Sequence, residues 1–201
     1  MSSMYHDGQR KLQQEFDTQQ LADKLEEKLV KDFLNPKQKA FIESADMFFL
    51  ATADEKGHPT CTYRGGDPGF VRALDDHTIA VPNYDGNGMY FSWGNVLKNP
   101  SIGMLFIDFM KGWRLRIHGN ATISRDDPLM GDFPEAQFIV RIHTREVFGN
   151  CPRYIHKYQL VERCGFVPHA DRVTPIPDWK KQPDFQKVLA KNDPARVIKS
   201  P

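Results

Sequence analysis

The chain has 201 residues, of which 40% are hydrophobic and 11% aromatic, so it can bury one core and its length predicts one domain with appended segments. A formal net charge of +1 removes the electrostatic argument for nucleic acid or an anionic membrane as its partner, and we expect neither. No signal-peptide core and no run approaching about 20 apolar residues is present, which predicts a cytoplasmic protein.

Residues 1–35 predict an N-terminal helical extension. Apolar residues recur mostly at four-residue spacing from Gln9 to Phe33, with charged residues between them, which is typical of one amphipathic helix. A helix with such a narrow apolar stripe is not stable alone, so we expect it to pack on the body of the protein or on a partner subunit. Asn35 and Pro36 then begin a second helix, because Asn is a good cap and Pro suits the first turn.

From residue 47 the apolar period changes to that of short strands separated by turns rich in Gly, Pro, Asn and Asp. Two short helices interrupt the strands, at 89–97 and 126–130. This pattern predicts a mainly β domain with flanking helices over residues 36–166, arranged as a closed or partly closed antiparallel barrel. The predicted strands are 47–53, 60–64, 70–74, 78–82, 102–107, 113–124 and 137–148. A proline-rich tail, 167–201, suits an arm more than a core element.

Sequence signatures of catalysis and metal binding are missing. The chain has no GxGxxG, GxxxxGK[ST], GxSxG or HExxH motif, its seven histidines are scattered, and we predict no metal site. Its three cysteines form neither an even set nor a CxxC pair, so we expect reduced thiols, with Cys61 as a small buried hydrophobe. A chain of this kind can rely on a cofactor for its chemistry.

Two segments have the character of an anion site. In the first, Tyr63-Arg64-Gly65-Gly66, an arginine at a strand end next to two glycines offers a bidentate fork and close backbone approach. In the second, the loop 82–88 leads into a helix at Met89, whose free N–H groups and dipole favour an anion. Each feature alone is also compatible with an ordinary turn.

Taken in order, three segments resemble the pyridoxamine 5′-phosphate oxidase-like family of FMN-binding split barrels: ATADEKGHPTCTYRGGDPGFV, TIAVPNYDGNGMYFSWGNVLKNPSIGMLFID and WRLRIHGNATI. The resemblance covers roughly residues 37–165. It implies a six-stranded antiparallel split barrel, a homodimer, and FMN bound at the subunit interface.

The resemblance also implies the cofactor-binding residues. Arg64 corresponds to the arginine that binds the FMN phosphate, and Asn87 lies in the phosphate loop. Arg114 matches the position that reaches FMN from the other subunit. The other implied contacts are Tyr63 and Gly65 beside the phosphate, the strand end Val81, Pro82 and Asn83 whose backbone faces the flavin ring, and Asn95 on the following helix. We expect Trp113 and Tyr84 to line the flavin cleft, and Tyr154, His156 and Cys151 to be possible neighbours of the reactive ring.

The chain departs from the authentic oxidases in two places. Asn87-Gly88-Met89 replaces their basic phosphate loop, and their C-terminal tryptophan and arginine pattern is missing. We therefore predict an FMN-binding oxidoreductase of this family with an unknown small-molecule substrate and unassigned catalytic residues. The alternatives are a split barrel that uses deazaflavin or heme, a non-catalytic flavin carrier or sensor, and a dimeric interaction module that has lost its cofactor.

Overall fold

The computed structural model describes residues 4–197 and divides the chain into two compact units, Met1–Leu160 and Val161–Pro201. The first unit contains the sheet and the helices α1 to α4, and the second contains two short helices. Among the described residues, no helix is long and apolar enough to cross a membrane.

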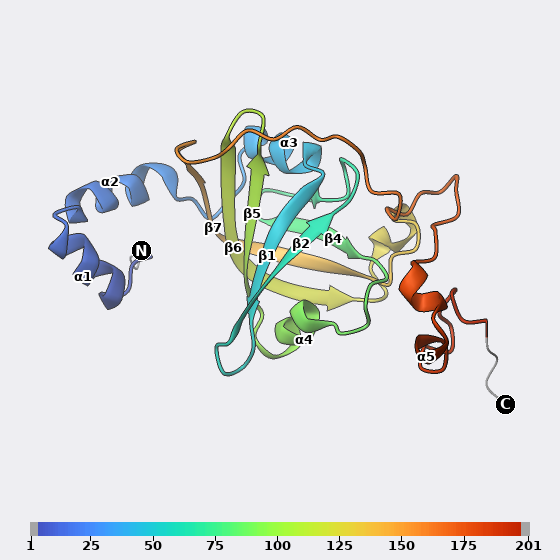
Figure 1. Ribbon diagram of the computed structural model, residues 1–201. Helices are drawn as coiled ribbons and strands as arrows, with labels where there is room; N and C mark the ends of the chain where they lie inside the picture. The colour runs from blue at the N-terminus through green and yellow to red at the C-terminus, as the bar shows by residue number, and fades with distance from the viewer. Residues whose placement is uncertain (1–3, 198–201) are drawn as a thin grey trace. The chain divides into compact units, whose positions relative to one another are not determined.

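The first unit is built on a seven-stranded sheet in which every pair of neighbours is antiparallel. The order of the strands is β2-β1-β5-β6-β7-β4-β3, and the sheet curls around its own buried face (Figure 1). The strands are β1 Met47–Ala53, β2 Pro59–Gly65, β3 Arg72–Ala73, β4 Thr78–Asn83, β5 Ser101–Asp108, β6 Trp113–Ser124 and β7 Phe138–Asn150. The predicted split barrel is confirmed; the segment predicted as strand 70–74 forms only the two-residue β3.

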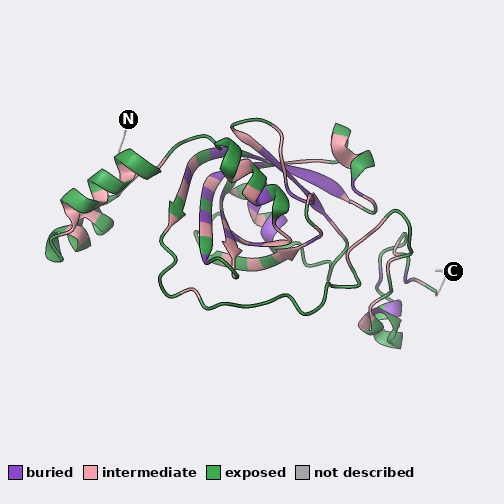
Figure 2. Cartoon of the chain, turned by 90° about the horizontal axis from the view of Figure 1, so that it is seen from above, coloured by how far each residue is buried: buried purple, intermediate pink, exposed green. Residues whose placement is uncertain are grey.

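The two-residue period of the strands decides what lies inside. Phe48 and Leu50 on β1, Met104 and Phe106 on β5, and Ile117 on β6 are all at most 2% exposed. Figure 2 shows buried and more exposed residues alternating along the strands of the curved sheet. The register pairs Phe48 with Arg64 and Leu50 with Thr62, so the inner face of β2 carries Thr62 and Arg64 instead of apolar residues.

The same register corrects the prediction for Cys61. Cys61 pairs with Ala51, and both are exposed on the outer face of the sheet. The expected burial was wrong because a one-residue difference in a strand changes the face of the sheet, and the local sequence of β2 does not say which face is inner.

Two helices close the barrel. Helix α3, Pro36–Ser44, begins with the expected Asn35 cap, completed as a capping box by Gln38, and buries Ile42. Helix α4, Phe91–Lys98, buries Trp93 and Val96 in the same core as β1, β5 and β6. Its position brings a tryptophan to the inner face of β2.

The N-terminal segment forms two helices, where the apolar period predicted one. Helix α1 spans Asp7–Glu15 and α2 spans Gln19–Leu29. Asp17 adopts φ 52° between them, a left-handed conformation that Asp tolerates better than most residues and that ends a helix. Neither helix has a buried residue, and Lys31 continues the chain by a β-bridge to Val147.

The second unit has a small interior of its own. A 3₁₀-helix, η2, spans Asp178–Lys181, and helix α5 spans Pro183–Gln186. Lys180 is 2% exposed and its Nζ lies 2.7 Å from Asp193 Oδ2, while Gln186 Nε2 donates to the carbonyls of Lys180 and Ala195. This segment therefore has more internal structure than a simple proline-rich arm.

Candidate functional site

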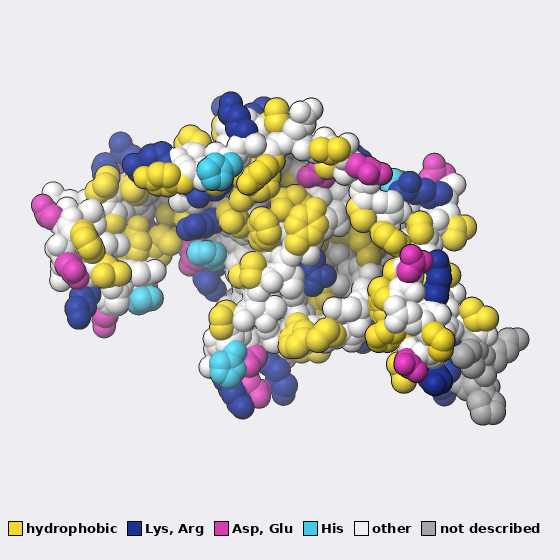
Figure 3. Space-filling model, in the orientation of Figure 1, with side chains coloured by type: hydrophobic (Ala, Val, Ile, Leu, Met, Phe, Trp, Pro, Cys, Tyr) yellow, Lys and Arg dark blue, Asp and Glu magenta, His cyan; other side chains and the backbone are white. Residues whose placement is uncertain are grey.

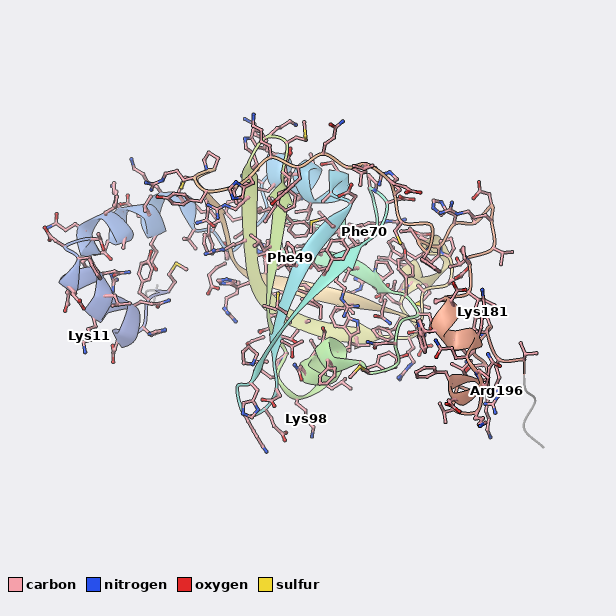
Figure 4. All side chains as sticks on the ribbon, viewed as in Figure 1. Lys11, Phe49, Phe70, Lys98, Lys181 and Arg196 are labelled. Carbon is pink, nitrogen blue, oxygen red and sulfur yellow. The ribbon has the colours of Figure 1, made fainter. Side chains whose placement is uncertain are left out.

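A pocket of about 390 Å³ opens where the end of β2 meets the end of β4 and the start of α4. This volume lies within the range of small-molecule and cofactor sites. Its lining residues come from two stretches of chain and from two core phenylalanines: 62–65, 81–93, Phe48 and Phe70. Phe70, labelled in Figure 4, stacks on Phe48 at 5.8 Å between ring centroids and forms part of the apolar floor.

Arg64 is the cation of this pocket. Its Nη1 donates to Asn83 Oδ1 at 3.4 Å, and its guanidinium carbon lies 4.7 Å from the centre of the Trp93 ring. Burial lowers the pKa of Arg64, since the surroundings of the guanidinium are poor in water. Its Nε is buried and has no hydrogen-bond partner among the described residues.

No carboxylate balances this guanidinium within residues 4–197. Although Asp85 lies in the pocket lining, Arg64 takes part in none of the ion pairs of the described chain. A desolvated cation with an unused buried donor is unfavourable unless an anion completes it, because an unsatisfied buried donor costs about 1–3 kcal/mol. The residues around Arg64 therefore fit a negatively charged ligand group.

The loop after β4 delivers the start of α4 to the pocket. Asn87 Oδ1 accepts a hydrogen bond from Met89 N at 3.0 Å, and Tyr90 adopts φ 50° immediately before the helix. Tyr90 gives no side-chain cap, and the first backbone bond of the helix runs from Gly94 N to Tyr90 O. The preceding N–H groups, which have no intrahelical partner, lie in the stretch that lines the pocket.

Tyr84 adds a half-buried phenol to the wall. Burial first, and the negative charge of Asp67 second, raise the pKa of Tyr84 to about 12, while Arg72 acts in the opposite direction. The phenol is therefore neutral at physiological pH and can serve as a hydrogen-bonding or stacking group.

The structure brings most of the predicted cofactor-binding residues together. Seven of them line this same pocket: Tyr63, Arg64, Gly65, Val81, Pro82, Asn83 and Asn87. Tyr84, which was expected in the flavin cleft, lines it too.

The remaining predicted residues lie outside the pocket of their own chain. Asn95 Nδ2 donates to Thr52 Oγ1 at 3.1 Å and thereby ties α4 to β1. Arg114 Nη2 donates to the carbonyl of Cys151, and Trp113 is 60% exposed with its ring edge-on to Phe41. Tyr154, His156 and Cys151 are also exposed and away from this lining. The expected reach of Arg114 into a partner's site stays a prediction.

The sequence analysis did not identify several residues of the site. Trp93 and Tyr90 line the pocket, and Gln137 joins them through hydrogen bonds to Tyr90 and Asn83. The signal for Trp93 was available, since it is the third residue of the helix that follows the glycine-rich loop. Gln137 precedes a distant strand, and no local pattern connects it with this loop.

Comparison with known proteins gives the family. The sequence model described as pyridoxamine 5′-phosphate oxidase matches residues 34–162, and the chain belongs to this family. No curated protein matches the chain.

Comparison with solved structures gives the following three among its matches. HupZ of Group A Streptococcus is 20% identical, with 58% of this chain and 93% of that chain covered and a TM-score of 0.47. HutZ, the heme storage protein of Vibrio cholerae, is 19% identical over 57% of this chain and 93% of that chain, with a TM-score of 0.41. An F420 reductase is 17% identical over 58% and 98%, with a TM-score of 0.40.

Proposed function

We propose that this member of the pyridoxamine 5′-phosphate oxidase family binds FMN in the pocket at β2, β4 and α4, and works as an FMN-dependent oxidoreductase on a small molecule. The observation that carries the proposal is Arg64, a desolvated guanidinium with an unused buried Nε and no carboxylate partner among the described residues. A phosphate ester supplies the missing negative charge and accepts several hydrogen bonds.

The phosphate end of the site is polar and small. Beside Arg64 it offers the uncapped amides at the start of α4 and the side chain of Asn87. A helix start of this kind favours an anion through its free N–H groups and dipole. The chain has no lysine or second arginine in the pocket lining, so Arg64 supplies the main charge.

The edge of β4 offers hydrogen-bonding groups for the flavin ring. One edge of β4 pairs with β7 over the whole of β4, from Thr78 to Asn83. On the other edge, β3 pairs only with Ile79 and Ala80. Among the described residues, the backbone edge of residues 81–83 therefore has no strand partner on the β3 side, and these residues line the pocket. These groups suit the pyrimidine edge of the isoalloxazine, while Phe48, Phe70 and Tyr84 provide flat apolar surface.

These groups indicate which roles belong to the cofactor and which to the chain. When bound, FMN supplies the capacity to accept and donate electrons or hydride. The chain holds the phosphate at Arg64, orients the ring along the edge of β4, and excludes water with its aromatic residues. No side chain is assigned here as a proton donor or base.

The outer face of the sheet supports a homodimer. Tyr63, Phe49 and Leu105 are register neighbours on this face, and the rings of Phe49 and Tyr63 meet at 6.1 Å. Tyr63 is 62% exposed, and Figure 3 shows hydrophobic side chains gathered over β1 and β2. We propose that a second copy covers this face, which borders the pocket through Tyr63 and places the flavin at the subunit interface.

The cofactor is tested by the absorption spectrum of freshly purified protein and by identification of the chromophore released by acid. We expect FMN, or uptake of added FMN at a stoichiometry of one per chain. A released heme or deazaflavin, or a colourless protein that takes up no FMN, would contradict the proposal. Rapid bleaching of the bound flavin by NADH or NADPH followed by turnover supports the enzyme, whereas no turnover with any donor supports a carrier or sensor.

The dimer is tested by sedimentation of the wild type and of Leu105→Glu. We expect a dimer for the wild type and dissociation for the variant, since a charge at the centre of the apolar face is disfavoured at an interface. A wild type that sediments as a monomer would contradict the homodimer.

A further inference from the structure

Within residues 4–197, two side chains hold the Arg64 guanidinium, and the family resemblance assigned neither side chain to this role. Trp93 lies under the guanidinium at 4.7 Å, and Asn83 Oδ1 accepts from Nη1 at 3.4 Å. Trp93 Nε1 donates to the same Asn83 oxygen at 2.6 Å. Trp93 and Asn83 are 3% and 4% exposed, so this support is part of the core.

The Asn83 amide is fixed in orientation by its own hydrogen bonds. Its Nδ2 donates to Gln137 Oε1 at 2.8 Å and to the Tyr84 carbonyl at 3.1 Å, which uses both amide hydrogens. The Tyr90 hydroxyl donates to the same Gln137 oxygen at 3.0 Å. The remaining Asn83 oxygen must therefore face the two donors, Trp93 and Arg64.

This arrangement restrains a long side chain before any ligand arrives. A free arginine loses considerable rotamer entropy when it binds an anion, and this loss weakens binding. Stacking on an indole and one neutral acceptor orient the guanidinium without neutralising its charge. An aspartate at position 83 would instead place a carboxylate against the guanidinium and occupy the charge that a phosphate needs.

We infer that Trp93 and Asn83 are positioning residues that preorganise Arg64 and thereby set the preference of this pocket for a phosphorylated flavin over the unphosphorylated one. The inference rests on the proposed FMN site. It assigns to the Asn83 side chain a role separate from that expected of its backbone. Both residues act through Arg64, and their effect is confined to the phosphate end of the ligand.

The test compares the Kd of FMN with the Kd of riboflavin, measured by quenching of flavin fluorescence. Trp93→Phe removes the indole N–H and weakens the cation–π contact, and we expect its FMN affinity to fall about tenfold while riboflavin affinity is unchanged. In an Arg64→Met background, Trp93→Phe should no longer change the ratio of the two affinities. Phe133→Leu is the matched control, since Phe133 supports Arg72 in the same way outside the pocket lining, and it should leave the ratio unchanged.

Asn83→Asp keeps the shape of the side chain and decides the question if Trp93→Phe does not fold. The new carboxylate gives Arg64 a permanent partner, and we expect the preference for FMN to fall about a hundredfold with little change for riboflavin. An equal loss of both affinities, or an unchanged ratio in the folded variants, would overturn the inference while leaving FMN binding by the wild type in place. A wild type that binds no FMN would overturn the proposed function and this inference with it.

Discussion

Arg64 and Arg72 in the β domain both stack on aromatic rings, and they differ in how their charge is balanced. Arg72 lies over Phe133 at 4.4 Å and forms an ion pair with Asp132. Next to it, Arg141 forms a bidentate pair with Asp127, at 2.6 and 3.1 Å. We call these five residues the η1 cluster, since they surround the 3₁₀-helix η1, Pro128–Asp132. Arg64 stacks on Trp93 at 4.7 Å but has no carboxylate partner in the described chain.

The comparison separates a structural arginine from a binding one. Stacking on an aromatic ring occurs in both places and indicates little by itself. The η1 cluster contains two cations and two anions, so its charges are balanced and its hydrogen bonds are internal. In contrast, Arg64 has no carboxylate partner among the described residues, and it lines a pocket large enough for a cofactor. The missing counter-charge is thus the informative feature of the site.

The largest expected effect comes from removing Arg64 and Arg72 separately. Arg64→Met should raise the Kd for FMN at least about a hundredfold, because charge-assisted hydrogen bonds to the phosphate contribute about 1.5–3 kcal/mol each. Arg72→Met should leave the Kd unchanged, since Arg72 lies outside the pocket lining. Fluorescence titration measures both. Equal losses in the two variants would mean that the comparison does not identify the site.

Two adjacent glycines sharpen the comparison at the rim of the pocket. A Cβ on Gly66 would lie 2.4 Å from Phe70 Cγ, and Gly66 is buried, so Gly66→Ala should lower the free energy of unfolding by about 1–3 kcal/mol. A Cβ on Gly65 would meet the ring of the exposed Tyr63 at 2.8 Å, and this ring can move away. Gly65→Ala should therefore change stability much less. Urea denaturation distinguishes them; the reverse order would show that Phe70 can move and Tyr63 cannot.

The η1 cluster should affect stability and not flavin binding. Asp127→Asn weakens the pair with Arg141, whose side chain is 40% exposed and therefore partly screened, so we expect a loss of about 1 kcal/mol in the free energy of unfolding. The Kd for FMN should be unchanged. Chemical denaturation and flavin titration of the same preparation measure the two quantities. A variant that binds FMN more weakly would connect the two regions.

The pH dependence of this pair gives the smallest effect. The hydrogen bond from Arg141 lowers the pKa of Asp127 below its ordinary value of 3.8, against an opposing contribution from burial. A depressed pKa in the folded state stabilises the protein above the unfolded value and ceases to do so as pH falls through the folded value. The stability difference between wild type and Asp127→Asn should therefore be full at pH 7 and shrink below pH about 4. A difference that grows on acidification would contradict this assignment.

The sequence by itself determined the local structure of the β domain. β1 and β6 begin and end where the sequence predicted, at Met47–Ala53 and Trp113–Ser124. The first is a short apolar run closed by a turn-rich segment, and the second alternates between a solvent face and a core face. The Gly-rich loop before α4 was also recognisable, since its residues specify a turn chemistry. The sequence determined the helices of the N-terminal segment less well. Its apolar spacing continues through Asp17, and this spacing does not reveal that a single residue in a left-handed conformation divides the helix in two.

Only the tertiary structure decided the environment of Arg64. Four strands, β1, β5, β6 and β7, separate β2 from β4 in the sheet, yet Arg64 on β2 donates to Asn83 on β4 because the sheet curls until its two ends meet. The same closure brings Trp93 under the guanidinium and Gln137 behind Asn83. The pairing of β2 with β1 decided that Cys61 lies on the outer face of the sheet and Arg64 on the inner face. Local patterns name the residue types of such a site, but long-range strand pairing and closure of the barrel determine which of them touch.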